Sequence, residues 1–145
     1  MFELHPQLAA DSVLLGRLPL CQVRLSRDSR YPWLILIPEM AGVREIHQLP
    51  PEARVQLLAE SCQVAELMEQ ITSADKMNVA ALGNMVPQLH LHHVARFQDD
   101  DAWPAPIWGK HPARPYEAEA LTAAATSWRH HLASLDQFNP AQDGQ

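Results

Sequence analysis

The sequence predicts an α+β fold, an antiparallel sheet meander with a central helix packed on one face and a C-terminal helix. Residues 33–37, WLILI, form an apolar run of strand length bounded by prolines, which is typical of a strand covered on both faces. Residues 50–73 follow with the apolar spacing of an amphipathic helix. The chain has 145 residues, 47% of them hydrophobic, which is enough for one domain with its own core. We expect this domain to span 1–138 and the tail, 139–145, to be disordered.

The first part of the chain predicts a short helix and a pair of strands. Pro6, followed by small and apolar residues, indicates an opening helix with Gly16 near its end. Residues 18–25 place apolar side chains among polar ones, and we interpret them as the hairpin partner of the apolar strand. Residues 39–49 are then a loop.

The helix predicted over 50–73 begins with residues that suit a first turn. Pro50 and Pro51 are tolerated there, and Glu52 lies near the positive end of the helix dipole. Its apolar side chains should cover one face of the sheet. The main stripe is expected to comprise Val55, Leu58, Cys62, Ala65 and Met68, widened by Leu57, Val64, Leu67 and Ile71.

Two more strands, a loop and a helix complete the predicted order. Residues 77–82 and 89–97 are predicted strands joined by a turn. The stretch WPAPIWG, residues 103–109, fits neither a helix nor a strand period, and we expect a long loop of the kind that often carries function. A terminal helix is predicted over 114–138, with one face formed by Leu121, Ala125, Trp128, Leu132 and Leu135.

Composition restricts the class of partner. The chain has 11 Lys and Arg against 17 Asp and Glu, a formal net charge of −6, and no basic run, which disfavours a nucleic-acid polymer as partner. We expect no membrane association and a cytoplasmic location, because no window is long and apolar enough for a membrane span and the N-terminus lacks signal-peptide features. Cys21 and Cys62 lie far apart, and we interpret both as reduced core residues.

Histidine is the unusual component, with eight in the chain and His90, His92 and His93 within four consecutive positions. Alternate residues of a strand share a face, so His90 and His92 should point one way, roughly 7 Å apart, and His93 the other. The residues alone leave three interpretations of this pair open. It is a polar part of a solvated face, a metal site completed by His47 or His111, or a catalytic pair in which one imidazole attacks and its neighbour serves the leaving group.

The segment PQLHLHHVAR, residues 87–96, resembles the signature of the histidine triad (HIT) superfamily, His-x-His-x-His followed by two apolar residues. Other segments resemble the family's elements in the same order: the apolar strand ending in Pro38, the helix after it, the strand and turn MNVAALGN, and Trp103-Pro104. The resemblance covers roughly residues 18–108. It implies a HIT-like α+β domain that binds a nucleotide, needs no metal or cofactor and is commonly a homodimer.

Carried over position by position, the resemblance implies a reaction at the α-phosphorus of a nucleotidyl substrate. His90 takes the position of the nucleophile, which becomes a covalent nucleotidyl-imidazole. His92 takes that of the histidine that hydrogen-bonds the phosphate and assists the leaving group. Asn84 falls where the family places a phosphate-binding polar side chain, and Asp28 matches its ribose-binding residue. Further candidates for substrate binding are Asn78, Arg96 and Trp103.

Two positions depart from the family pattern. The first triad residue is Gln88, which we interpret as an orienting residue, because an amide can hydrogen-bond but does not carry a proton. The family's histidine at the start of the apolar strand is replaced by Trp33. The resemblance favours a nucleotide hydrolase or nucleotidyltransferase. The alternative is a nucleotide-binding or interaction module without turnover.

Overall fold

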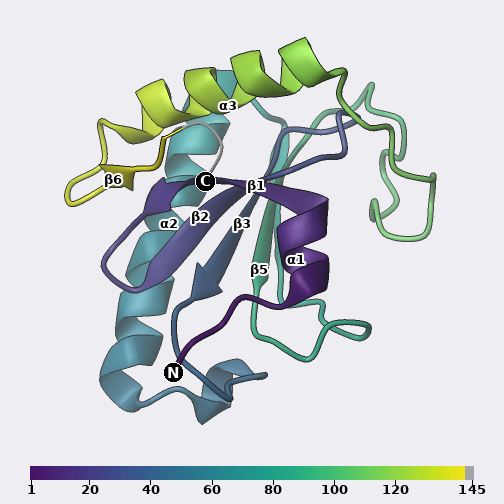
Figure 1. Ribbon diagram of the computed structural model, residues 1–145. Coiled ribbons are helices and arrows are strands. Elements are labelled where there is room, and N and C mark those ends of the chain that lie inside the picture. The colour runs from purple at the N-terminus through teal and green to yellow at the C-terminus, as the bar shows by residue number, and fades with distance from the viewer. Residues whose placement is uncertain (143–145) are drawn as a thin grey trace.

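A computed structural model describes residues 1–142 as a six-stranded antiparallel sheet with helices packed on it (Figure 1). The strands lie in the order β4-β5-β3-β2-β1-β6, and the α+β prediction is confirmed. The elements are α1 (Pro6–Asp11), β1 (Ser12–Arg17), β2 (Cys21–Ser26), β3 (Trp33–Pro38), a 3-10 helix (Ile46–Gln48), α2 (Pro51–Thr72), β4 (Lys76–Ala80), β5 (Leu91–Arg96), α3 (Ala118–Leu132) and β6 (Asn139–Pro140).

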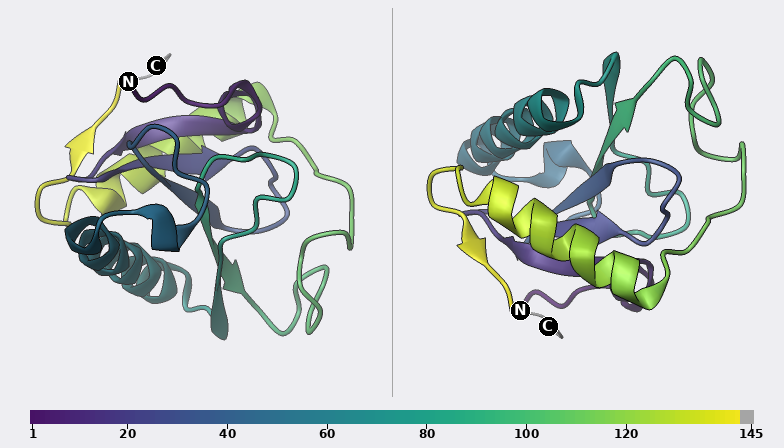
Figure 2. Two further views of the ribbon diagram at one scale, coloured as in Figure 1. Left: turned by 90° about the horizontal axis from the view of Figure 1, so that it is seen from below. Right: turned by 90° about the horizontal axis from the view of Figure 1, so that it is seen from above.

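Different parts of the chain cover the two faces of the sheet. Leu34 and Leu36 of β3 belong to the main core, which the sheet forms with α2 and α3. Ile35 and Ile37 point to the other face and pack with Leu8 in a smaller cluster beneath the N-terminal segment. Figure 2 shows the connection between β5 and α3 extending on the side of the molecule away from α2. The apolar strand is therefore covered on both faces, as its composition predicts.

The opening helix is shorter than predicted. It ends at Asp11, and residues 12–17 form β1, between β2 and β6. Pairing with β2 satisfies the backbone groups of this segment. Gly16 lies where β6 approaches most closely, since a Cβ there would fall 2.5 Å from the carbonyl oxygen of Asn139. Strand pairing with β2 and β6, which the apolar pattern of residues 6–16 does not reveal, replaces the end of the predicted helix.

The face that α2 turns to the sheet differs from the predicted one. Val55 and Leu58, assigned to the main stripe, are 71% and 65% exposed. Glu60 is buried instead, and its carboxylate accepts hydrogen bonds from the amides of Leu20 and Cys21 at 2.9 and 3.0 Å. A buried polar side chain at this interface is not predicted by an apolar pattern. The buried residues of α2 are Ala53, Leu57, Glu60, Ser61, Val64, Leu67 and Met68.

The two cysteines lie in different environments. Cys21 and Cys62 are both free, and Cys21 is buried as predicted. The prediction is wrong for Cys62, which is exposed because it lies on the outer side of α2.

Within residues 1–142, no helix has the length and apolar character to cross a membrane.

The C-terminal helix begins later than predicted. Pro115 pairs with Asp28 in an isolated β-bridge, so the chain is extended there, and α3 starts only at Ala118. The predicted apolar face does pack on the main core. Its members are buried or half-buried there: Leu121, Ala125, Trp128, Leu132 and Leu135.

The chain after α3 returns to the sheet. β6 pairs with β1, and the amide of Ala141 donates to the carbonyl oxygen of Leu15 at 2.9 Å. The disorder predicted for the tail is therefore wrong for residues 139–141, because they complete the edge of the sheet. Residues 143–145 lie outside the described part of the chain.

Replacement of Gly16 by Ala should lower the free energy of unfolding by about 1–3 kcal/mol, since the added methyl group meets backbone and the ring of Phe138. Chemical denaturation of both chains measures the loss. A chain truncated after Gln137 lacks both contacts, and the same substitution should cost far less in it. An equal loss in the full-length and truncated chains would contradict the role given to β6.

Candidate functional site

A cavity of about 600 Å³ opens on the face of the sheet opposite α2. It is lined by residues of β3, by the turn at 82–86, by the triad segment and by part of the connection at 107–115. Most of the lining is apolar. Its titratable side chains are Asp11, Arg27, Asp28, His90, His92 and His111.

His90 immediately precedes β5, and the backbone beside it fixes its buried imidazole. Nδ1 lies 2.6 Å from the carbonyl oxygen of Gln88. A carbonyl oxygen can only accept, so Nδ1 carries the proton and Nε2 of the neutral ring carries the lone pair. The preceding turn also packs closely on the ring, because a Cβ at Gly83 would lie 3.5 Å from Cε1 of His90. Nε2 is therefore the nitrogen left for a ligand.

His92 is protonated on the other nitrogen, because the partner of its Nδ1 is a hydrogen-bond donor. The indole Nε1 of Trp33 donates to its Nδ1 at 2.9 Å. An indole can only donate, so the proton of the neutral imidazole is on Nε2. Burial and the neighbouring His90 lower the pKa of His92 to about 4, against the opposing hydrogen bond to the carbonyl of Leu82. At neutral pH, His92 is thus an uncharged hydrogen-bond donor through Nε2.

The two imidazoles lie side by side in the cavity lining. Their centroids are 4.9 Å apart and their planes are nearly perpendicular, at 82°. The structure therefore brings together one unprotonated nitrogen, on His90, and one N–H group, on His92. This is the juxtaposition that the alternation of the strand predicts.

His93 points to the opposite face, as predicted. Its Nδ1 donates to the carbonyl of Leu91 at 3.1 Å, which leaves Nε2 to accept from the hydroxyl of Ser61 at 2.7 Å. Burial lowers the pKa of His93 to about 4, although its backbone hydrogen bonds oppose the shift. His93 fastens β5 to α2 and takes no part in the cavity.

Asp28 and Asn84 both line the cavity. Asp28 is buried at the end of the β2 segment, and its Oδ1 accepts from the amides of Arg30 and Arg114 at 3.0 and 3.1 Å. No described residue donates to its Oδ2 in a recorded hydrogen bond. Asn84 is exposed in the turn before the triad segment. The structure therefore places an oxygen acceptor and an amide at the same cavity as the two histidines.

The side chain of Gln88 binds the N-terminal segment and has no hydrogen bond to His90 or His92. Its Oε1 accepts from the amide of His5 and its Nε2 donates to the carbonyl of Glu3, both at 2.8 Å. These bonds tie the N-terminal segment to the triad segment. Gln88 contacts His90 through its backbone carbonyl, so any orienting effect passes through the main chain and not through the amide that the sequence singled out.

Three predicted substrate-binding residues lie outside the cavity lining: Asn78, Arg96 and Trp103. Arg96 is 2% exposed and fully engaged. It pairs with Asp100 at 2.8 Å and donates to Asn78 and to the carbonyl of Ala105, both at 2.8 Å, while its guanidinium lies over the ring of Trp103. These contacts give Arg96 a structural role at the β5–α3 connection, and substrate binding by the three residues stays a prediction.

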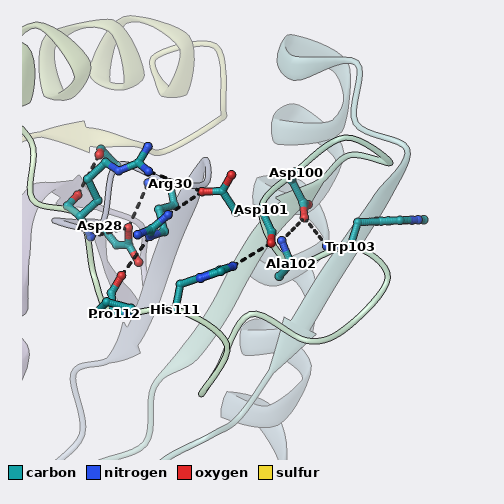
Figure 3. Close-up of polar contacts among 10 residues, drawn as sticks. Asp28, Arg30, Asp100, Asp101, Ala102, Trp103, His111 and Pro112 are labelled. Atoms are coloured by element: carbon teal, nitrogen blue, oxygen red, sulfur yellow. Dashed lines mark hydrogen bonds and ion pairs between the residues drawn. The ribbon is translucent and has the colours of Figure 1, made fainter.

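Asp100 and Arg30 hold that connection against the sheet. Burial would raise the pKa of Asp100, but hydrogen bonds from Arg96 and from three backbone amides outweigh it and lower the pKa to about 2. Figure 3 shows Arg30 reaching Asp101 and the carbonyl of Pro112, at 2.7 and 2.9 Å. The segment that forms one side of the cavity is therefore anchored at both ends.

The WPAPIWG loop contributes Trp108 to the cavity lining in place of the predicted candidate Trp103. The ring centroid of Trp108 lies 5.3 Å from that of His92 and 6.2 Å from that of Trp33. No spacing signal separates the two tryptophans of this loop. Sequence reasoning missed Arg27, because a lone arginine after a strand carries no signal. Within residues 1–142, no group of three His, Cys, Asp or Glu side chains is arranged to hold a metal ion.

The part of the chain that contains the two imidazoles matches a known protein family. The pattern of the HIT domain matches residues 7–99. The chain belongs to the histidine triad (HIT) family. The match begins in α1 and ends just beyond β5, so it contains the cavity's two imidazoles and Trp33.

Solved structures agree over nearly the whole chain. A histidine triad protein from Marinobacter aquaeolei VT8 shares 50% identity with a TM-score of 0.89, over 93% of this chain and 98% of that one. A HIT protein from Sinorhizobium meliloti 1021 shares 40% identity with a TM-score of 0.86, over 93% and 98%. A histidine triad protein from Bradyrhizobium japonicum shares 38% identity with a TM-score of 0.85, over 90% and 97%. No protein with a curated description matches the sequence.

The two buried histidines of β5 should make the stability of this HIT protein depend on pH. His92 and His93 have pKa values of about 4 when folded, below the ordinary value of 6.5. The unfolded chain therefore binds about two more protons between these values, and the free energy of unfolding falls as the pH drops from 6.5 to 4. Denaturant titrations across this range measure the proton uptake. In His92→Gln it should be smaller by about one proton, and an unchanged uptake would contradict the burial of neutral His92.

Proposed function

We propose that this HIT protein is a nucleotide hydrolase or nucleotidyltransferase that reacts at the α-phosphorus through His90. One observation carries the proposal: two adjacent imidazoles in one cavity have opposite proton positions. Nε2 of His90 has a lone pair, and Nε2 of His92 has a proton. A nucleophile next to a hydrogen-bond donor is the arrangement that attack on a phosphoryl group requires.

The reaction consists of two displacements. In the first, the lone pair on Nε2 of His90 forms a bond to phosphorus, and the bond to the leaving group breaks with its electron pair on that group. The ring then carries a positive charge, which the Gln88 carbonyl stabilises by accepting from Nδ1–H. In the second, water or another acceptor attacks phosphorus and gives its proton to solvent, and the electron pair of the nitrogen–phosphorus bond returns to Nε2.

The negative charge that develops on the phosphoryl oxygens needs donors. His92 supplies Nε2–H to a phosphoryl oxygen, since its Nδ1 already accepts from Trp33. The amide of Asn84 is the second donor, from the exposed turn that borders the cavity. Both are neutral, which suits a reacting group with a single negative charge.

The remainder of the cavity fits a nucleoside. The carboxylate of Asp28 offers Oδ2 to ribose hydroxyl groups, since Oδ1 is already occupied by backbone amides. Apolar side chains, including Leu8, Ile107 and Trp108, provide a surface for the base. An apolar pocket with a few polar groups that fix orientation is typical of a small-molecule site.

Exposed apolar side chains on α2 support the homodimer that the sequence analysis expects. Val55 and Leu58 are one helical turn apart and mostly exposed. Such a surface is costly to leave in water, and a second copy of the chain would cover it.

Incubation with acetyl-adenylate, followed by intact mass measurement under neutral denaturing conditions, tests the reaction. The unmutated chain should gain the mass of one adenylyl group, because the intermediate is covalent. His90→Ala should gain none, since no other imidazole presents an unprotonated nitrogen in the same place.

His130→Ala is the matched control, because this histidine is exposed on α3 and lies outside the cavity lining. Its adduct should equal that of the unmutated chain. Saturable nucleotide binding with no adduct and no turnover would instead identify a binding module. An adduct that persists in His90→Ala would contradict the assignment of the nucleophile.

A further inference from the structure

Trp33 is placed to control the protonation of His92. It is the first residue of β3, and its half-buried indole donates to Nδ1 of His92 at 2.9 Å. The two ring centroids are 5.4 Å apart, and the ring of Trp108 packs against both. The donor is thus held in a packed aromatic cluster and is not a freely rotating side chain.

This contact disfavours an imidazolium at His92. Protonation of Nδ1 would direct an N–H group at the N–H group of Trp33 across 2.9 Å, and neither can accept. The facing titratable neighbour is His90, with His93 on the reverse of the strand. The other titratable groups of the cavity lining are Asp11, Arg27, Asp28 and His111, and none of them has a recorded hydrogen bond to His92.

We propose that Trp33 keeps His92 a neutral donor during the reaction and thereby selects leaving groups that depart as stable anions. The inference rests on the proposed function. In the first displacement, the bond from phosphorus to oxygen breaks, its electron pair stays on the oxygen, and His92 transfers no proton. An amine leaving group would need that proton, because an amide anion is too basic to depart.

The charged side chains of the cavity lining also limit how much negative charge a leaving group can carry. Its lining holds two carboxylates, Asp11 and Asp28, against one arginine, Arg27. A polyphosphate leaving group would add several negative charges here, whereas a carboxylate adds one. A leaving group that adds a single negative charge is therefore favoured over a polyphosphate.

The test compares two adenylyl donors, acetyl-adenylate with a carboxylate leaving group and adenosine 5′-phosphoromorpholidate with an amine leaving group. The ratio of their kcat/KM values is measured in the unmutated chain and in Trp33→Phe, which keeps an aromatic ring and loses the N–H group. We expect the ratio to shift about tenfold towards the amine in Trp33→Phe, the effect of about one hydrogen bond.

Trp108→Phe is the matched control, since this indole contacts the His92 ring without a hydrogen bond to it. Absolute rates are free to change in this variant, but the ratio should not. The imidazole ¹⁵N shifts of His92 supply a readout independent of turnover, and they should show a higher titration midpoint in Trp33→Phe than in Trp108→Phe. Equal midpoints would overturn the role of Trp33.

A pH profile of the unmutated chain tests the inference without a variant. The rate with acetyl-adenylate should not decline between pH 6 and 8, because His92 acts in its neutral form. A rate that declines as His92 loses a proton in this range would overturn the inference and leave the proposed function intact. Failure to react with either donor would instead refute the proposed function.

Discussion

The pairing of β5 with β3 sets the directions in which His92 and His93 point. His92 lies opposite Ile35 and His93 opposite Leu34, so the first faces the cavity and the second faces α2. A slip of one residue would exchange the two faces. The register is held from both sides, by the hydrogen bond between His93 and Ser61 and by the apolar residues of β3. The chemistry of the site therefore depends on the alternation of one buried strand.

With this register, two uncharged hydrogen-bond partners determine which nitrogen of each imidazole is protonated. The carbonyl of Gln88 can only accept and the indole of Trp33 can only donate, so His90 and His92 differ in which nitrogen is protonated. The two departures from the family pattern thus have different consequences. The backbone carbonyl of Gln88 contacts His90 and its side chain binds the N-terminal segment, whereas the indole of Trp33 donates directly to the imidazole of His92.

The sequence predicts those parts of the molecule that local periodicity determines. The apolar strand, the existence of α2 and the opposite directions of His92 and His93 follow from spacing alone. The position of β1 and the inward face of α2 do not, because they depend on pairing with β2 and with the C-terminal β6 and on the buried carboxylate of Glu60. Arg96 shares the cavity face of its strand by spacing, but Asp100 draws its side chain into the following connection.

The assignment of opposite protonation to the two rings is the central claim. Imidazole ¹⁵N spectra of the unmutated chain at neutral pH test it most directly, with His90→Gln and His92→Gln used to identify the signals. The account predicts that His90 is protonated at Nδ1 and His92 at Nε2, with neither ring carrying both protons. The same nitrogen protonated in both rings, or a doubly protonated His92, would contradict it.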